Sequence, residues 1–231
     1  MKPNYTKALI IGAGAGLSAS LARLFAAKGL KLALAARSTG DLAALAAETG
    51  ATVHTCDSGD QAQVAALFTA LDGEGAPDVV VYNPSARVRG PFVELDPQAV
   101  ANAVQVTAIG AFYAAQEAAK RMLPAGHGAI LFTGASAGVK GYPQSASFAM
   151  GKFALRGLAQ SMARELHPKG LHIGHFVIDG GIRSAEKQET PDSPDSMLDP
   201  DAIAGSYWHF LEQDRSSWSW EIEVRPWVER F

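Results

Sequence analysis

Three glycines near the N-terminus have the spacing of a phosphate-binding turn. In the stretch ALIIGAGAGLSASLARLFAAKG, Gly12, Gly14 and Gly16 separate an apolar run from a segment with helical spacing. Glycines allow a tight turn and a close approach of a pyrophosphate, so Leu17 is also expected beside the cofactor, and the helix predicted from Ser18 presents free N–H groups to that anion. Because the turn lies between a predicted strand and a predicted helix, it indicates a dinucleotide site rather than a ligand-free glycine-rich connection.

The end of the second apolar run bears on the choice between NAD(H) and NADP(H). The run KLALAA ends in Ala36, and Arg37, Ser38 and Thr39 follow it. An acidic residue here would bind the adenosine ribose and repel a 2′-phosphate, whereas a guanidinium beside two hydroxyls suits a 2′-phosphate. The sequence therefore favours NADP(H) over NAD(H). The alternative is that Arg37 is only a solvated loop cation.

A long helix predicted over 147–166 carries Phe148 and Lys152 one turn apart on one face. Phenylalanine has no proton to give, so Phe148 cannot act as a general acid. Three other side chains that exchange protons lie close to it in the sequence, namely Ser136, Tyr142 and Ser147. These residues are the candidates for proton transfer near Lys152.

The histidines and the single cysteine do not predict a metal site. His172 and His175 are three residues apart on a predicted strand, which puts them on opposite faces, and we interpret them as structural or surface residues. His54 and Cys56 share a face of another strand, but two ligands without a further acidic or sulfur group are weak grounds for zinc. Strand packing is the simpler interpretation of both pairs.

Composition limits the classes of partner. The chain has 231 residues, 48% of them apolar, and a net charge of −3, which gives no reason to expect nucleic acid or an anionic membrane. No stretch approaches the run of about 18 apolar residues of a membrane span, and the glycine-broken N-terminus does not fit a signal peptide. The single cysteine cannot form an internal disulfide, so we expect a reducing cytoplasm. The expected partner is a small-molecule substrate.

Short apolar runs alternate with longer Ala-rich segments of helical spacing along the chain. The predicted strands are KALIIG, LKLALAA, ATVHTC, DVVVY, GAILFTG, LHIGHFVI and WEIEVRPW, and the predicted helices cover 18–28, 41–48, 60–71, 97–122, 147–166 and 199–212. Continuously apolar strands are buried on both faces, which indicates a parallel sheet between two layers of helices. We therefore predict one α/β domain over residues 1–231.

The segment 184–200 differs from the rest of the chain. Its sequence SAEKQETPDSPDSMLDP is acidic, rich in proline and nearly devoid of apolar residues, which predicts a mobile loop. A C-terminal helix and strand then follow within 201–231. The tryptophans of this end either line a pocket or pack in the core or a subunit contact, and we favour packing; they are Trp208, Trp218, Trp220 and Trp227.

The chain resembles the short-chain dehydrogenase/reductase family over essentially its whole length. The residues that carry the resemblance are Gly12 and Gly16 in the turn, Asp57 in HTCDSGD, Asn83 in YNPS, and Lys152 in FAMGKFALRGLAQSMAREL. The resemblance implies a doubly wound, Rossmann-like α/β fold with a parallel sheet of about seven strands. It also implies that Asp57 lies near the adenine and that Lys152 binds the nicotinamide ribose.

The departures from the family pattern fall on the catalytic positions. Phe148 replaces the proton-donating tyrosine, and Thr107 stands where the family has an asparagine. The position thirteen residues before Phe148 is Ala135 rather than serine, although Ser136 is adjacent. Small changes also touch the cofactor positions: Ser18 replaces the last glycine of the turn, and DGGI, which supplies Gly180, replaces the usual Pro-Gly after the sixth strand.

The resemblance leaves two hypotheses about function. In the first, the protein is an NADP(H)-preferring oxidoreductase that transfers hydride between nicotinamide and a small carbonyl or alcohol, with Ser136 contacting the substrate and Tyr142 as proton donor. An activated double bond or an iminium would need less help from a general acid. In the second, the protein binds the dinucleotide but has lost reductase chemistry and acts as a sensor or partner subunit. A domain without dinucleotide is disfavoured because the glycine turn and Lys152 remain.

The resemblance also implies subunit contacts and a lid. We expect a homodimer or homotetramer formed through the helices 97–122 and 147–166, with close packing allowed by small residues of the first helix, which are Ala108, Gly110, Ala111, Ala114 and Ala115. The acidic loop 184–200 falls where the resemblance implies a substrate lid.

Overall fold

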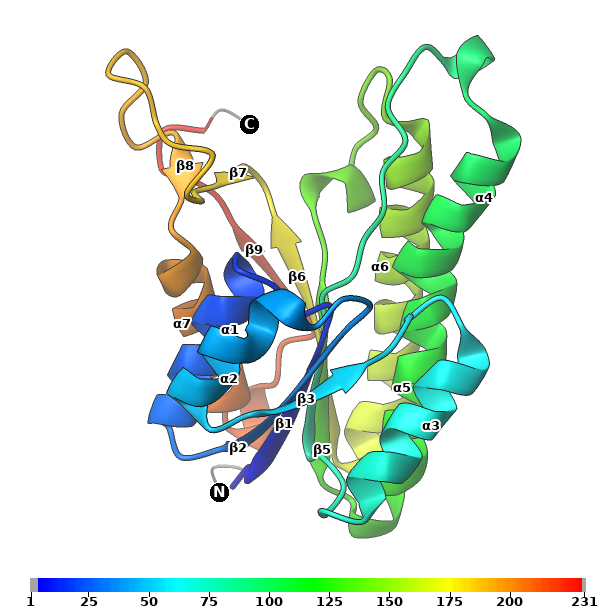
Figure 1. Ribbon diagram of the computed structural model, residues 1–231, viewed down its shortest axis with the longest axis vertical. Helices are drawn as coiled ribbons and strands as arrows, with labels where there is room; N and C mark the ends of the chain where they lie inside the picture. Colours follow the sequence, from blue (N-terminus) through cyan, green and yellow to red (C-terminus); the bar gives the residue numbers. More distant parts are fainter. Residues whose placement is uncertain (1–3, 230–231) are drawn as a thin grey trace.

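The computed structural model describes residues 4–229 and contains a seven-stranded parallel sheet (Figure 1). The strand order is β3-β2-β1-β4-β5-β6-β9. The chain adds strands on one side of β1 up to β3 and then on its other side from β4 onward, so the strand order reverses between β1 and β4. The strands are β1 (Lys7–Ile11), β2 (Lys31–Ala36), β3 (Thr52–Thr55), β4 (Val79–Tyr82), β5 (Gly128–Thr133), β6 (Leu171–Ile178) and β9 (Glu221–Val224). The predicted doubly wound Rossmann-like fold is confirmed.

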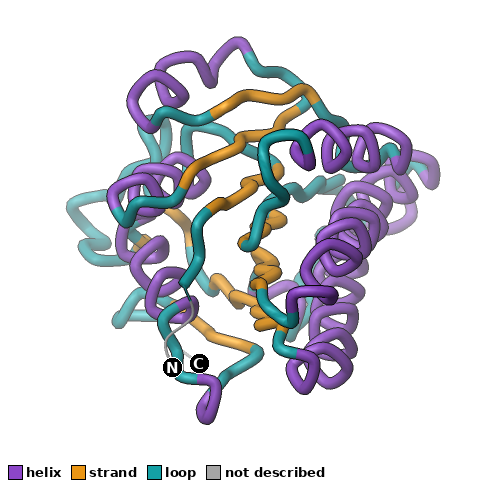
Figure 2. The backbone as a smooth tube through the Cα atoms, turned by 90° about the horizontal axis from the view of Figure 1, so that it is seen from below, coloured by secondary structure: helices purple, strands orange, loops and turns teal. Residues whose placement is uncertain are grey.

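Helices cover both faces of this sheet (Figures 1 and 2). One face carries α1 (Leu17–Ala27), α2 (Ala43–Thr49) and α7 (Pro200–Leu211), and the other carries α3 (Gln61–Asp72), α4 (Pro97–Val104), α5 (Gly110–Met122) and α6 (Ala146–Leu166). Each layer closes its own apolar cluster against the sheet. Every residue of β1, β4, β5 and β6 is buried, as continuously apolar strands predict.

Aspartates start three of the helices. The side chains of Asp60, Asp96 and Asp199 accept hydrogen bonds from the first backbone N–H groups of α3, α4 and α7. A carboxylate at this position satisfies donors that the helix itself leaves free. The caps explain why these helices begin within one residue of the predicted positions.

The segment 97–122 is not one regular α-helix as predicted. A π-helical turn, Gln105–Ile109, separates α4 from α5 and includes the buried Thr107. Against it packs Gly151 of α6, where an added Cβ would lie 2.8 Å from the Cβ of Thr107. Such turns realign the residues of a helix, and here the turn lies beside the predicted active-site helix.

The small residues predicted to pack between subunits are instead buried within the chain. They are Ala108, Gly110, Ala111, Ala114 and Ala115, and all face the protein's own core. The exposed side of the same helix carries Ile109 and Phe112, which are 41% and 44% exposed. The prediction chose the wrong face, because small residues suit close packing of a helix on its own sheet as well as on a partner.

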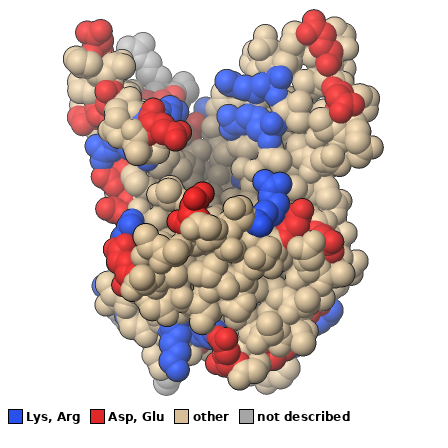
Figure 3. Space-filling view, in the orientation of Figure 1, with Lys and Arg blue, Asp and Glu red and all other residues tan. Residues whose placement is uncertain are grey.

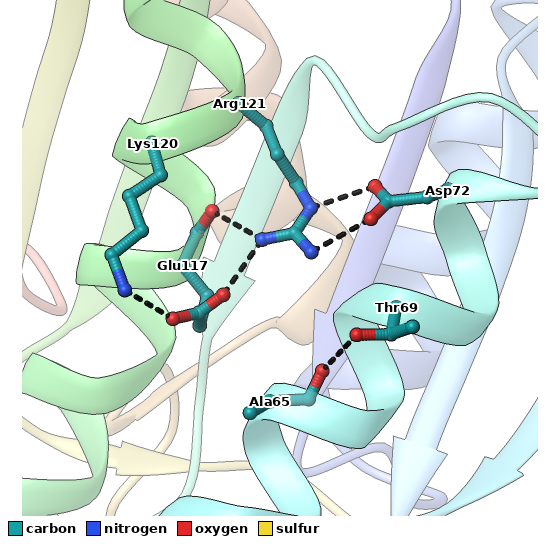
Figure 4. Close-up of polar contacts among 6 residues, drawn as sticks. All are labelled: Ala65, Thr69, Asp72, Glu117, Lys120 and Arg121. Atoms are coloured by element: carbon teal, nitrogen blue, oxygen red, sulfur yellow. Dashed lines mark hydrogen bonds and ion pairs between the residues drawn. The ribbon is translucent and has the colours of Figure 1, made fainter.

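Arg121 joins α5 to the end of α3 (Figure 4). Its guanidinium makes two hydrogen bonds of 2.7 Å to the carboxylate of Asp72 and one of 2.7 Å to Glu117. The ion pair with Arg121 lowers the pKa of Asp72. This contact lies on the helix layer that supports α6.

The segment after β6 forms a second, small sheet. Strands β7 (Gly181–Ile182) and β8 (Met197–Leu198) pair in parallel, and an exposed acidic loop connects them. The strand β8 was not predicted within 184–200, whereas the C-terminal helix and strand were. Among the tryptophans, Trp218 stacks on His172 at 4.3 Å between ring centroids, and Trp227 is 81% exposed.

Candidate functional site

A groove runs along the carboxyl ends of the strands, at the point where the strand order reverses between β1 and β4. It consists of two adjoining cavities of about 420 and 350 Å³ that share Asn83 and Ser85. The first is lined by Gly12, Arg37 and Ser38 among others, and the second by Gly16, Leu17, Phe148, Lys152 and Gly180. Open α/β sheets bind dinucleotides at such a reversal.

Gly12 has a geometry that only glycine adopts without strain. Its φ is +79°, its N–H donates to the carbonyl of Ala35 at 2.8 Å, and an added Cβ would lie 2.8 Å from Pro84. Gly14 and Gly16 differ, since an added Cβ at either position would meet nothing within 4 Å. The turn is therefore packed against Pro84 at Gly12, whereas its side at Gly14 and Gly16 is open.

The start of α1 is free to bind an anion. Gly16 precedes the helix, no side chain caps it, and its first turn holds no acidic residue. N–H groups at such an end need a partner from outside the helix, and a phosphate supplies one.

Ser18 and Asn83 join the glycine turn to the end of β4. The amide of Asn83 donates to Ser18 Oγ at 2.7 Å, and Ser18 Oγ donates to the carbonyl of Gly12 at 2.9 Å. Serine in place of the usual glycine therefore stabilises the turn with a side-chain contact. The buried Ser18 hydroxyl leaves the open side of the turn unobstructed.

The far end of the groove carries the residues predicted to bind adenosine. Arg37 and Ser38 are exposed and line the first cavity. Asp57 does not line it, although its neighbours Cys56 and Ser58 do. The carboxylate of Asp57 instead accepts the N–H of Gly59 at 2.9 Å, which shapes the loop after β3.

Lys152 is buried at the inner end of the second cavity. The residue is 2% exposed, and its ammonium donates to the carbonyl of Thr133 at 2.6 Å. Burial, and then repulsion from Arg87, lowers the pKa of Lys152 to about 7. A lysine in this state exchanges protons near neutral pH and still offers donors to a ligand in the groove.

A third cavity, of about 270 Å³, adjoins the second at Phe148. Ser136, Tyr142 and Phe148 line it together, so the structure brings three of the predicted catalytic candidates to one place; Ser147, a further candidate, does not line it. Ser136 is half-buried and Tyr142 is 42% exposed. The cavity is also lined by Arg87 and Arg89, which the sequence analysis did not single out.

The segment that carries these arginines is extended and alternates in exposure. Ser85, Arg87 and Arg89 are exposed, while Ala86 and Val88 are half-buried. An alternating pattern of small or apolar residues with basic ones in SARVR is the signal that could have identified them, because residues two apart share a face of an extended chain. The prediction considered only Asn83 in this stretch.

Two hydroxyl groups fix the backbone of this segment. Thr107 Oγ1 accepts the N–H of Ala86 at 3.0 Å. Ser147 Oγ accepts the N–H of Val88 at 2.9 Å and donates to its carbonyl at 3.0 Å. Thr107 and Ser147 are therefore occupied with backbone groups, and both are fully buried.

Arg87 lies over the ring of Phe148. The guanidinium carbon is 3.8 Å from the ring centroid, and Lys152 Nζ is 5.7 Å from the same centroid. A planar guanidinium on an aromatic face is a favourable stacking contact. The ring at the family's tyrosine position thus supports a cation instead of donating a proton.

Asp179, at the position of the family's proline, is a buried ion-pair centre. Its carboxylate lies 3.3 Å from Lys140 and 3.8 Å from Arg225. Lys140 in turn lies 5.8 Å from the ring centroid of Tyr142. Asp179 therefore joins the loop that carries Tyr142 to the C-terminal strand.

The two histidines of β6 are structural. His172 stacks between Phe210 and Trp218, and His175 lies 3.0 Å from Glu221. Burial lowers their pKa values to about 3 and about 4. Within residues 4–229 no three His, Cys, Asp or Glu side chains gather as a metal site would require.

No helix in the described part of the chain is long and apolar enough to span a membrane.

Comparisons with known proteins agree with this geometry. Residues 6–193 match the family model described as short chain dehydrogenase. D-threitol dehydrogenase of Mycolicibacterium smegmatis is 29% identical over 217 residues, which are 86% of this chain and 83% of that protein.

Two solved structures share the fold over almost the whole chain. A short-chain dehydrogenase from Rhodopseudomonas palustris is 34% identical, with a TM-score of 0.83 over 97% of this chain and 100% of that one. A metagenomic short-chain oxidoreductase in complex with NADP is 26% identical, with a TM-score of 0.83 over 96% of this chain and 98% of the other. The family match over most of the sequence, the sheet order and the glycine turn agree, and the chain belongs to the short-chain dehydrogenase family.

Proposed function

We propose that this member of the family, an oxidoreductase that uses NAD(P)(H), prefers NADP(H) and acts on a small carbonyl or alcohol. The observation that carries the proposal is the buried Lys152 at the inner end of a groove that continues to the glycine turn. Burying a lysine costs stability, so a role in ligand binding or in the reaction is the expected reason for its presence.

The residues along the groove fit a dinucleotide. The open side of Gly14 and Gly16 and the uncapped start of α1 suit the pyrophosphate. Arg37 and Ser38 suit a 2′-phosphate, and Lys152, which lines the second cavity, suits the nicotinamide ribose. When bound, the nicotinamide supplies or accepts the hydride at the substrate carbon.

The proton that accompanies hydride transfer must come from a residue other than Phe148. Reduction of a carbonyl adds hydride to carbon and leaves an alkoxide, which then takes one proton. Tyr142 and Ser136 line the same cavity as Phe148, so we assign the proton to the Tyr142 hydroxyl and the contact with the substrate oxygen to Ser136. Replacing Tyr142 by Phe should then lower kcat without weakening dinucleotide binding.

A second candidate function is dinucleotide binding without turnover, as a sensor or a partner subunit. The observation that favours it is the loss of the family's polar groups at Phe148 and Ala135, together with the occupied hydroxyl of Thr107. Tight NADPH binding with no consumption of NADPH across a broad carbonyl and enone panel would support this alternative over catalysis.

The test is a fluorescence titration of the purified protein with NADPH and, in parallel, with NADH. We expect micromolar binding of NADPH and at least tenfold weaker binding of NADH, about 1.4 kcal/mol. Arg37→Ala should remove most of this preference, and Arg164→Ala, an equal change of charge on the exposed side of α6, should leave it intact. No binding of either dinucleotide would refute the proposal.

We also propose that α5 and α6 form a subunit interface. Their outer surface exposes Ile109, Phe112, Met150 and Phe153, each between 41% and 55%. Several large apolar side chains left exposed on neighbouring segments are typical of a site of protein contact. Phe112→Glu should shift the mass measured by light scattering toward the monomer, while Phe92→Glu, a change at an exposed phenylalanine elsewhere, should not.

A further inference from the structure

The substrate side of the groove has an excess of positive charge. Arg87 and Arg89 line the 270 Å³ cavity, and none of its lining residues is acidic. Lys152 adds a third basic group behind Phe148. Figure 3 shows Lys and Arg side chains on one wall of the hollow between the two arms of the molecule, whereas the opposite arm carries acidic and basic side chains together.

Neither arginine is neutralised by a neighbour in the described part of the chain. Arg87 contacts the Phe148 ring, and no ion pair with a carboxylate involves Arg87 or Arg89 there. Burial, and then repulsion from Arg89, lowers the pKa of Arg87. Two like charges held together without a counter-ion raise the electrostatic potential of the cavity, which an anion would relieve.

The backbone beside Arg87 and the guanidinium of Arg87 are both held in place. Hydroxyls of Thr107 and Ser147 bind the backbone on both sides of Arg87, and the Phe148 ring supports its guanidinium. Because the backbone and one side chain are already ordered, an anion gains contacts with little further loss of conformational entropy. Arg87 and Arg89 thus form a prepared site.

We propose that Arg87 and Arg89 bind an anionic group of the substrate, so that the enzyme acts on small carbonyl compounds that carry a carboxylate or a phosphate. Guanidinium groups recognise both oxyanions through paired hydrogen bonds. Ser136 and Tyr142 line the same cavity, so the anion and the reacting carbonyl of one small molecule fit together. The reaction in this proposal rests on the proposed function. The preference for an anionic substrate rests on the two arginines that line the cavity.

Phe148 acquires a role in this site. A tyrosine would keep the aromatic face but add a hydroxyl beside Lys152, whereas phenylalanine offers an apolar platform to Arg87 at 3.8 Å. Phe148 is thus a positioning residue for Arg87, which accounts for a large ring at a position that gives no proton.

The acidic loop between β7 and β8 is the alternative partner for Arg87 and Arg89, because its carboxylates could bind them in place of a substrate anion. Its carboxylates are partly engaged within the loop, since Glu189 accepts the N–H groups of Asp195 and Met197, and Asp195 accepts from the Trp227 indole. No acidic residue of this loop lines the cavity. A small anion is therefore favoured over the loop as the ligand of the arginines.

The test compares charged probes with neutral counterparts by calorimetric titration of the protein, without and with NADPH. The probes are pyruvate against methyl pyruvate, acetoacetate against methyl acetoacetate, and dihydroxyacetone phosphate against dihydroxyacetone. We expect at least one anion to bind tenfold or more tightly than its neutral partner. The carboxylate and phosphate pairs distinguish the two oxyanions.

Variants assign the preference to this site. Arg87→Gln and Arg89→Gln should each weaken the favoured anion at least tenfold, with little change for the neutral partner. Arg164→Gln makes the same change of net charge at an exposed position of α6 and should have no effect. A charged probe that binds no better than its neutral partner, or that is insensitive to both substitutions, overturns the proposal.

Failure of the proposed function would look different. Anion preference without NADPH binding would support the arginine site and refute the oxidoreductase assignment. NADPH binding and turnover of neutral carbonyls without anion preference would refute the arginine site alone. Stronger anion binding after Glu186→Gln with Asp192→Asn would show that the loop occupies the arginines, and it would also overturn the proposal.

Discussion

The two ends of the groove differ in the groups that form them. The nucleotide end consists of backbone groups and small side chains: Gly12 with its left-handed φ, the uncapped start of α1, and Ser18 with Asn83 beneath the turn. The substrate end consists of long charged and aromatic side chains, with Arg87 stacked on Phe148.

This difference explains which end keeps the family pattern. A backbone-built site needs particular residues for geometric reasons, since no side chain fits the space beside Pro84 that Gly12 leaves. A side-chain-built site can change its chemistry by substitution while the same strands and helices support it. The departures at Phe148 and Ala135 therefore leave the fold intact.

The largest expected effect comes from restoring the family's hydroxyl. Phe148→Tyr places a phenol on the α6 face that carries Lys152, where it can protonate the substrate oxygen. We expect kcat/KM for ketone reduction to rise about 10²-fold or more, a gain of about 3 kcal/mol in transition-state stabilisation. Initial rates of NADPH oxidation measure it.

The control for this change is Phe148→Tyr combined with Lys152→Met, which should lose the gain because the ammonium no longer stabilises the phenolate. A rate within twofold of the wild-type protein for Phe148→Tyr alone would contradict the assignment of this cavity as the place of hydride transfer.

The next effect concerns the cost of burying Lys152. Its pKa is about 7 in the folded protein and about 10.4 in the unfolded chain, so between these values the unfolded chain binds more protons. The free energy of unfolding should therefore rise with pH across this window, and the penalty is fully present below pH 7. Lys152→Met should remove the rise, which is of the order of a few kcal/mol.

Denaturant unfolding at pH 7 and pH 9.5 measures this slope. Lys31→Met, at the exposed start of β2, serves as the matched control and should keep the wild-type slope. Equal slopes for Lys152→Met and the wild-type protein would show that the ammonium stays solvated.

A smaller effect on stability should distinguish Gly12, which packs against Pro84, from Gly14, which does not. Gly12→Ala forces a Cβ to 2.8 Å from Pro84 at a φ of +79°, and we expect a loss of stability of about 2 kcal/mol. Gly14→Ala meets no atom within 4 Å and should change stability by about 0.5 kcal/mol or less. Equal losses of thermal stability would mean that the turn is not fixed as described.

The fold followed from the sequence because the signals were local and consistent. The strands are continuous apolar runs, the helices have clear periodicity, and Asp60, Asp96 and Asp199 cap helices at their predicted starts. The π-helical turn at Gln105–Ile109 was not predicted, because it depends on packing between Thr107 and Gly151 of another helix. Such a contact has no local signal.

Prediction of the site succeeded for motifs and failed for tertiary contacts. Gly12, Gly16 and Lys152 are recognisable because they belong to short patterns with fixed spacing. Arg87 and Phe148 are 61 positions apart in the sequence and meet only through the fold, so no single segment contains both.

The smallest effect tests how the substrate end is positioned. Thr107→Val keeps the shape of the side chain but removes the acceptor of the Ala86 N–H, and we expect a loss of about 1 kcal/mol in stability. Because Ala86 precedes Arg87, anion binding should weaken while NADPH affinity stays within twofold. The matched control is Thr69→Val, because Thr69 is an exposed residue of α3 whose hydroxyl donates to the carbonyl of Ala65 (Figure 4). Equal weakening of anion and NADPH binding would show that the two ends of the groove are not built independently.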